Sequence, residues 1–149
     1  MHRYFIELAY NGSGYNGWQI QPNAPSVQEE INKALSLLLK QEINVTGAGR
    51  TDTGVHASFF VAHFESDIAI SHTKALADKL NRFLGKNIAI KDIYAVQPDM
   101  HARFSAISRT YKYYINKTYD RYAYRKYFVI PFHTLFGSRR TFFSAFRRF

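Results

Sequence analysis

Cysteine is absent from this sequence of 149 residues. Its absence excludes disulfide scaffolds, thiolate zinc sites and cysteine nucleophiles together. Long hydrophobic runs are also lacking, since no apolar stretch approaches the roughly 18 residues that a membrane-spanning helix needs. Residues 1–10 (MHRYFIELAY) alternate polar and apolar side chains and lack the unbroken apolar segment of a secretory signal. We therefore expect a soluble, cytoplasmic protein, and a hydrophobic content of 46% is enough for one buried core.

Acidic residues are scarce in the last third of the chain. Residues 1–100 hold 9 Lys and Arg against 10 Asp and Glu, whereas residues 101–149 hold 11 Lys and Arg against the single acid Asp120, together with 15 of the 25 aromatic residues. Cations neutralise phosphates and rings stack on unpaired bases, so this composition favours an RNA-binding surface in residues 101–127. The alternative is a tail that is basic by accident. We prefer that alternative for residues 131–149, which show no clean period or helix caps and resemble unselected sequence, such as the product of a shifted reading frame.

Hydrophobic periodicity predicts the secondary structure of residues 1–117. Alternation at a period of two indicates strands, and apolar residues at helical spacing indicate amphipathic helices. Residues 26–29 (SVQE) form a capping box that begins the first helix. The predicted strands are residues 3–10, 43–46, 58–64, 88–96 and 103–117, and the predicted helices are residues 27–40 and 73–84.

The order β-α-β-β-α-β-β indicates the fold class. It resembles the α/β (α+β) arrangement called the ferredoxin-like split βαβ. In that arrangement an antiparallel sheet carries its helices on one face and leaves the other face for a partner. We place this domain at residues 1–117 and expect a basic aromatic tail at residues 118–149.

Two patterns that often mark cofactor or metal sites are weak here. Residues 12–17 (GSGYNG) match G-x-G-x-x-G after a predicted strand. That dinucleotide motif must open a helix, yet the chain continues into Trp18 and two prolines, so no helix N-terminus is available for a pyrophosphate. The 6 histidines show no H-x-H or H-E-x-x-H spacing. We expect no cofactor and no metal, and we interpret the histidines as structural or RNA-contacting residues.

Residues 47–57 (GAGRTDTGVHA) are the strongest candidate for a reactive loop. Glycines bracket Arg50 and Asp52 between two predicted strands. Glycine lets a backbone take positive φ and approach a ligand closely, and a carboxylate beside a guanidinium can be held ionised and aimed. The alternative is a tight turn that carries a surface ion pair. The spacing of the residues favours neither.

Together with three other segments, this loop resembles the tRNA pseudouridine synthase A (TruA) family. The resemblance runs from about residue 3 to about residue 117. It departs from the family pattern at Asn11, where the family commonly has aspartate, and in length, since family members carry a second, related half. The four segments stand in the family's order and are residues 10–21 (YNGSGYNGWQIQ), 26–29 (SVQE), 47–57 and 101–106 (HARFSA).

The resemblance implies an isomerase that converts uridine to pseudouridine at positions thirty-eight to forty of the tRNA anticodon stem-loop. The N1–C1′ bond breaks, the uracil turns, and a C5–C1′ bond forms without a cofactor or a metal. The family's catalytic aspartate, a nucleophile or a base, corresponds to Asp52. Its arginine, which pairs with that aspartate and helps to displace the base, corresponds to Arg50. The resemblance also implies a homodimer that shares the tRNA between its subunits.

A base in the anticodon stem is stacked and paired, so the enzyme must extrude it and hold it on a flat apolar surface. The resemblance assigns this stacking role to Tyr111, whereas the alternative is an ordinary core-facing strand residue. The alternative function is a non-catalytic module that grips single-stranded RNA, and such a module has no need for Arg50 and Asp52 on a glycine-flanked loop. The candidate phosphate contacts are Arg103, Arg109, Lys112 and Lys117.

Overall fold

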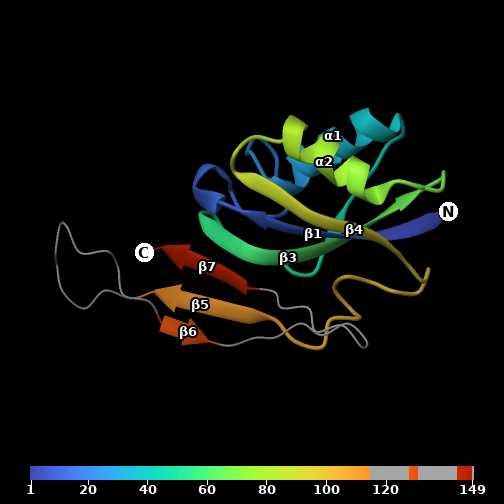
Figure 1. Cartoon of the computed structure of the whole chain (residues 1–149). Coiled ribbons are helices and arrows are strands. Elements are labelled where there is room, and N and C mark those ends of the chain that lie inside the picture. Colours follow the sequence, from blue (N-terminus) through green and yellow to red (C-terminus); the bar gives the residue numbers. More distant parts are fainter. Residues whose placement is uncertain (115–127, 131–143, 149) are drawn as a thin grey trace.

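The computed structural model describes residues 1–114, 128–130 and 144–148 (Figure 1). Its helices are α1 (Val27–Leu39), α2 (Thr73–Phe83) and the short 3-10 helix η1 (Gly12–Gly14). Both predicted helices and the predicted strands at 3–10, 58–64 and 88–96 are confirmed. The strands are β1 (His2–Tyr10), β2 (Thr46–Gly47), β3 (Val55–Ser66), β4 (Ile88–Val96), β5 (Thr110–Tyr114), β6 (Phe128–Ile130) and β7 (Ser144–Arg148).

The central sheet has the strand order β4-β1-β3, and β2 pairs with the outer edge of β3. Every one of these pairings is antiparallel. Helices α1 and α2 lie over the same face of β1, β3 and β4 (Figure 1). This is the arrangement of a ferredoxin-like split βαβ unit, so the predicted α+β fold is confirmed.

The main core lies between the two helices and the sheet. Alternation along β1 buries Ile6 and Leu8 on the helical side, where Ile31 and Leu35 of α1 meet them. Burying a side chain of this size stabilises the fold by about 2 kcal/mol.

Helix α1 begins where the capping box predicted. The Ser26 hydroxyl oxygen accepts a hydrogen bond from the Glu29 backbone N–H at 3.3 Å. The Glu29 carboxylate forms an ion pair with Lys33 at 2.6 Å, one turn further along the exposed side of the helix. The helix ends at Leu39, and the next residue, Lys40, takes the left-handed conformation with φ of 53°.

A smaller apolar cluster lies on the other face of the sheet. Phe5 points to this side because it alternates with the residues of the main core. Phe5, Val61 and Ala102 are buried together there, and Met100 and Ala106 pack against them. The segment after β4 therefore covers part of the face that topology alone would leave open to a partner.

The strand predicted at residues 103–117 is wrong over its first part, because β5 begins at Thr110. Residues 101–105 form a turn instead. The His101 ring nitrogen Nδ1 accepts hydrogen bonds from the backbone N–H groups of Arg103 at 3.1 Å and Phe104 at 3.3 Å. A side chain that binds the local backbone offers it an alternative to a sheet ladder. The alternation of polar and apolar residues along the sequence gives no sign that a side chain will take the place of a sheet partner.

The strand predicted at residues 43–46 is wrong except at Thr46, where the two-residue strand β2 begins, for a related reason. Side chains of α1 take the backbone groups that a strand neighbour would use. The Ser36 hydroxyl accepts from the Ile43 N–H at 2.8 Å, and the Asn32 carbonyl accepts from the Val45 N–H at 2.9 Å. These bonds dock the segment on the helix rather than on the sheet.

The predicted tail contributes two strands to the described residues. Strand β7 pairs antiparallel with β3 and parallel with β5, and β6 pairs antiparallel with β5. The sheet is thus extended beyond β3. The remaining positions of residues 118–149 lie outside the described residues. Within the described part of the chain, every helix is too short or too polar to span a bilayer.

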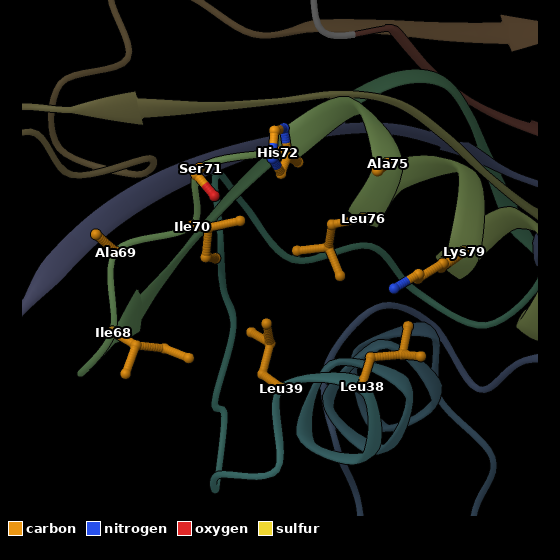
Figure 2. A pocket seen from close by; sticks show the side chains of 10 residues that line it. All are labelled: Leu38, Leu39, Ile68, Ala69, Ile70, Ser71, His72, Ala75, Leu76 and Lys79. Carbon is orange, nitrogen blue, oxygen red and sulfur yellow. The ribbon is translucent and has the colours of Figure 1, made fainter.

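An apolar hollow opens where the end of α1 faces the start of α2 (Figure 2). Its volume is about 300 Å³, and Leu38 and Leu76 point into it from the two helices. Ile68 and Ile70 line it from the connection between β3 and α2. The hollow lies on the helical side of the molecule.

Candidate active site

The residues predicted to react lie on the connection between β2 and β3. We call residues 48–54 the site loop, and both Arg50 and Asp52 are exposed on it. The two salt bridges among the described residues lie elsewhere, so the ion pair expected between Arg50 and Asp52 is not formed. Two exposed charges gain little from pairing in water, where the attraction is screened. Both interpretations of residues 47–57, the reactive loop and the turn with a surface ion pair, therefore lose the ion pair that each assumed.

The backbone of the site loop is held from two sides. On the sheet side, the Ala48 N–H donates to the carbonyl of Val61 at 2.8 Å. On the opposite side, the Trp18 N–H donates to the carbonyl of Thr51 at 3.2 Å. A backbone held in this way keeps the direction of its exposed side chains, which catalysis requires.

The glycines of residues 12–17 explain how the first loop packs so tightly on the site loop. Gly17 has φ of +95°, and a Cβ at this position would lie 2.1 Å from the carbonyl oxygen of Thr51. A Cβ at Gly12 would lie 2.0 Å from the carbonyl oxygen of Val55. The first and third glycines of the G-x-G-x-x-G pattern therefore serve contact between two backbones, which is a different use of glycine from phosphate binding.

Buried aromatic residues support the site loop from below. Trp18 is 2% exposed and stacks on Phe60 with ring centroids 4.1 Å apart. The Tyr10 hydroxyl and the Thr51 hydroxyl are hydrogen-bonded at 2.9 Å in the interior. Burial raises the pKa of Tyr10 above its ordinary value, so this hydroxyl stays neutral and acts as an anchor.

Arg109 approaches the site loop from the segment that leads into β5. Its Nε donates to the carbonyl of Ala48 at 2.7 Å, and its Nη2 donates to the carbonyl of Arg103. The structure thus gives this guanidinium two backbone partners, whereas the sequence suggested a phosphate. We call this pair of bonds the Arg109 clamp. It ties the site loop to the turn at residues 101–105.

Tyr111 lies beside the site loop as well. Its hydroxyl oxygen would be 3.7 Å from a Cβ built on Gly49, and its ring is half-buried against the main core. Tyr111 therefore packs against the core, as a strand residue does, and also lies next to the site loop. Lys112 belongs to β5, and Lys117 lies outside the described residues.

A polar hollow of about 250 Å³ opens next to the site loop. We call it the arginine hollow. Sequence reasoning missed it, although most of its lining belongs to the segments 10–21, 26–29 and 47–57. It is lined by Trp18, Gln19, Gln28, Thr46, Gly47, Gly49, Arg50 and Arg103.

A pair of histidines supports the turn at residues 101–105. The His63 ring on β3 accepts a hydrogen bond from the Ala102 N–H at 3.1 Å, and the rings of His63 and His101 lie 4.4 Å apart. Burial, with His101 and Arg3 nearby, lowers the pKa of His63 to about 4. Among the described residues, no three His, Asp or Glu side chains gather as metal ligands would. The role that the structure gives to His63 and His101 is structural.

The comparisons with known proteins bear on this site. The family model described as tRNA pseudouridine synthase matches residues 8–105. The chain belongs to this family. The matched range contains the site loop, the segment that packs on it and the turn that Arg109 holds, so the resemblance inferred from motifs is confirmed.

Relatives are similar along most of the chain. The tRNA pseudouridine synthase A of Bacteroides thetaiotaomicron is 50% identical over 148 residues, which cover 97% of this chain and 55% of the relative. That of Parabacteroides distasonis is 48% identical over 131 residues, which cover 88% of this chain and 52% of the relative. That of Chlamydia felis is 40% identical over 138 residues. The chain spans about half the length of the curated relatives it matches.

Proposed function

We propose that this protein acts as a tRNA pseudouridine synthase and that Asp52 carries the reaction. One observation supports the proposal above the others. An exposed carboxylate stands on a backbone that hydrogen bonds hold from both sides, within the range that matches the family model. The relatives named above are tRNA pseudouridine synthases A. We extend the proposal to uridines at positions thirty-eight to forty of the anticodon stem-loop, in line with the resemblance.

The reaction needs a group that can act as a nucleophile or a base. The N1–C1′ bond of uridine breaks, the uracil turns, and C5 bonds to C1′; the proton leaves C5 and N1 gains one. A carboxylate serves a covalent role or a proton-transfer role equally well, provided that it carries its negative charge. Atoms and charges balance without a redox partner, and in line with the resemblance we propose no cofactor and no metal.

The neighbours of Asp52 suit a base that has left its helix. Extrusion of a stacked base costs a few kcal/mol, which contacts in the pocket must offset. Arg50 is exposed two positions away and can help to displace the base. Tyr111 lies against the site loop next to Gly49 and offers a ring on which uracil can stack. We assign these roles to Arg50 and Tyr111.

The Arg109 clamp supports a positioning role for this arginine. Its two bonds join the carbonyls of Ala48 and Arg103, so the guanidinium holds the start of the site loop. Arg103 and Lys112 stay candidate phosphate contacts.

The test is formation of pseudouridine in tRNA incubated with the purified chain. Because the chain spans about half the length of its relatives, a chimaera that adds the remaining half of the Bacteroides thetaiotaomicron relative is assayed in parallel. Conversion confined to the anticodon stem-loop supports the proposal. Binding of tRNA without conversion in either protein favours the alternative, a non-catalytic RNA-binding module.

We also propose a cytoplasmic homodimer that shares one tRNA between its subunits. The basic composition of residues 101–149 supports contact with RNA, and the dimer follows from the resemblance alone. Sedimentation of the chimaera with and without tRNA measures the number of subunits. A complex with a single subunit per tRNA would contradict the dimer and leave the assignment of Asp52 in place.

A further inference from the structure

We propose that the arginine hollow binds a phosphodiester of the substrate RNA adjacent to the reacting nucleotide. The inference rests on the proposed function and adds a binding subsite to it. Arg50 and Arg103 are the charged residues among the described side chains that line the hollow, and both are exposed. A lining that carries cations and no carboxylate favours an anion.

The size of the hollow suits this ligand. Its volume is about 250 Å³. A water molecule takes up about 30 Å³ of liquid, so the hollow has room for roughly eight waters. This volume admits a phosphodiester with part of its ribose. Arg side chains bind phosphate oxygens through two parallel hydrogen bonds, which fixes orientation as well as affinity.

Other residues of the lining are held in place by hydrogen bonds and close packing. The Gln28 side chain donates to the carbonyl of Val45 at 2.7 Å and accepts from the Ile20 N–H at 3.0 Å. A Cβ at Gly47 would lie 2.5 Å from the Trp18 ring nitrogen, so glycine is needed here for Trp18 to pack against the lining. Rigid walls reduce the ordering cost of binding.

The segments that carry the two arginines are joined to each other. Arg50 stands on the site loop and Arg103 on the turn at residues 101–105, and the Arg109 clamp bonds to both segments. A phosphate between the two guanidinium groups would thus be held by parts that move together. The clamp uses the backbone carbonyl of Arg103 and leaves its guanidinium exposed.

The position of Arg50 near Asp52 limits which phosphate this is. The two residues are two positions apart, so their Cα atoms lie within about 7 Å of each other. We therefore place the phosphate at one of the linkages that flank the reacting uridine. The hollow would hold the strand on one side while the base turns beside Asp52.

The experiment pairs a change in the RNA with a change in the protein. Anticodon stem-loop RNAs carry an uncharged methylphosphonate at one of the linkages that flank the target uridine. Binding is measured with the wild-type chain and with Arg103→Gln, which keeps the backbone carbonyl for the clamp. Lys74→Gln, an exposed position on α2, is the matched control. Thermal melts monitored by Trp18 fluorescence establish that each variant is folded.

We expect one methylphosphonate linkage to weaken binding to the wild-type chain by about tenfold, the size of one charged hydrogen bond. Arg103→Gln should weaken binding of the unmodified RNA by a similar factor, and the two changes together should cost no more than either alone. Lys74→Gln should leave the methylphosphonate effect unchanged. Equal methylphosphonate effects in the wild type and in Arg103→Gln would overturn the proposal, as would no effect at any flanking linkage.

Failure of this inference differs from failure of the proposed function. If the hollow binds no phosphate, the wild-type chimaera still forms pseudouridine. In that case the methylphosphonate effect on binding is the same in the wild type and in Arg103→Gln. If the proposed function is wrong, neither protein converts uridine, whatever the linkage. RNA that binds neither protein at all would overturn both.

Discussion

At the scale of single residues, the decisive property of Asp52 is exposure without a salt bridge. Its side chain is open to solvent, while the backbone on either side of it is bonded to β3 and to the loop after β1. A carboxylate that only stabilised the turn would be expected to accept a hydrogen bond within it. Arg109 shows the opposite arrangement, since its guanidinium is bound to two carbonyls of the protein itself. The two residues therefore call for different tests.

Replacement of Asp52 by asparagine should abolish turnover and spare binding. The amide keeps the shape of the side chain and loses the charge, so it serves neither as a nucleophile nor as a base. We expect the single-turnover rate of pseudouridine formation in the chimaera to fall by at least about a thousandfold. Affinity for tRNA should stay the same or rise, because an acid near the phosphates is removed.

Asp78→Asn, an exposed change on α2, is the control for Asp52→Asn and should behave as the wild type. A rate for Asp52→Asn within tenfold of the wild type would return residues 47–57 to the interpretation of a plain turn.

Replacement of Arg109 by lysine separates positioning from phosphate contact. Lysine keeps the charge, but its single ammonium cannot reproduce a planar fork that reaches two carbonyls. We expect the single-turnover rate at saturating tRNA to fall by about tenfold to a hundredfold, because small displacements of reacting groups are costly. Affinity and its salt dependence should not change.

Arg82→Lys on α2 is the control for Arg109→Lys. Weaker binding of tRNA by Arg109→Lys, with a normal rate once the RNA saturates the enzyme, would mean that Arg109 contacts phosphate and that the clamp is incidental.

At the scale of elements, the site depends on two irregular segments docked on a regular sheet. The loop after β1 reaches the site loop through glycines that no other residue replaces without strain. The turn at residues 101–105 reaches it through Arg109 and is itself fastened to β3 by the bond between Ala102 and His63. The regular strands supply rigidity, and the irregular segments supply the side chains.

The bond between the turn and β3 should make stability depend on pH. Burial holds the pKa of His63 at about 4, against 6.5 in the unfolded chain, and lowers the pKa of His101 as well. The unfolded chain therefore takes up protons first as the pH falls below 6.5. Stability should be constant above that pH and should decrease by about 2 kcal/mol between pH 6.5 and 4.

Urea unfolding followed by Trp18 fluorescence measures this loss. His63→Asn keeps an acceptor for the Ala102 N–H and has no ionisable ring, so most of the dependence between pH 6.5 and 4 should disappear. Arg3 holds the pKa of Glu65 below its ordinary value of 4.5, so this carboxylate adds to the loss of stability only below about pH 4.5. An unchanged pH dependence in His63→Asn would assign the effect to other groups.

At the scale of the whole molecule, charge is divided along the chain. Residues 1–100 are nearly neutral, and residues 101–149 hold 11 of the 20 Lys and Arg. Binding to RNA through such a segment releases counterions from the phosphates. The fold brings the beginning of this segment, residues 101–111, against the site loop.

Affinity for tRNA should therefore fall steeply as salt rises. The logarithm of the binding constant should decrease linearly with the logarithm of salt concentration, with a slope of about −0.7 to −0.9 per phosphate contacted. Lys112→Gln should make the slope shallower by about one contact and should weaken binding to all tRNAs alike. Lys86→Gln, from the neutral part, is the control. Binding that stays the same between low and high salt would contradict a basic RNA surface.

Much of this protein was predictable from its sequence. The helices and the central strands follow from hydrophobic period, because a buried face must repeat at 3.6 or 2 residues. The four segments of the resemblance identified the family and drew attention to Asp52, since glycine and charge in that order are rare by chance. These inferences depend on local pattern, which needs no knowledge of distant contacts.

Only the tertiary structure decided how the site is assembled. Which backbone carbonyls Arg109 bonds and which residues line the arginine hollow both depend on segments far apart in sequence. Ala48 and Arg109 are 61 positions apart, yet one hydrogen bond joins them. Polar side chains and backbone groups take partners by geometry in three dimensions, and no periodicity along the chain encodes that choice.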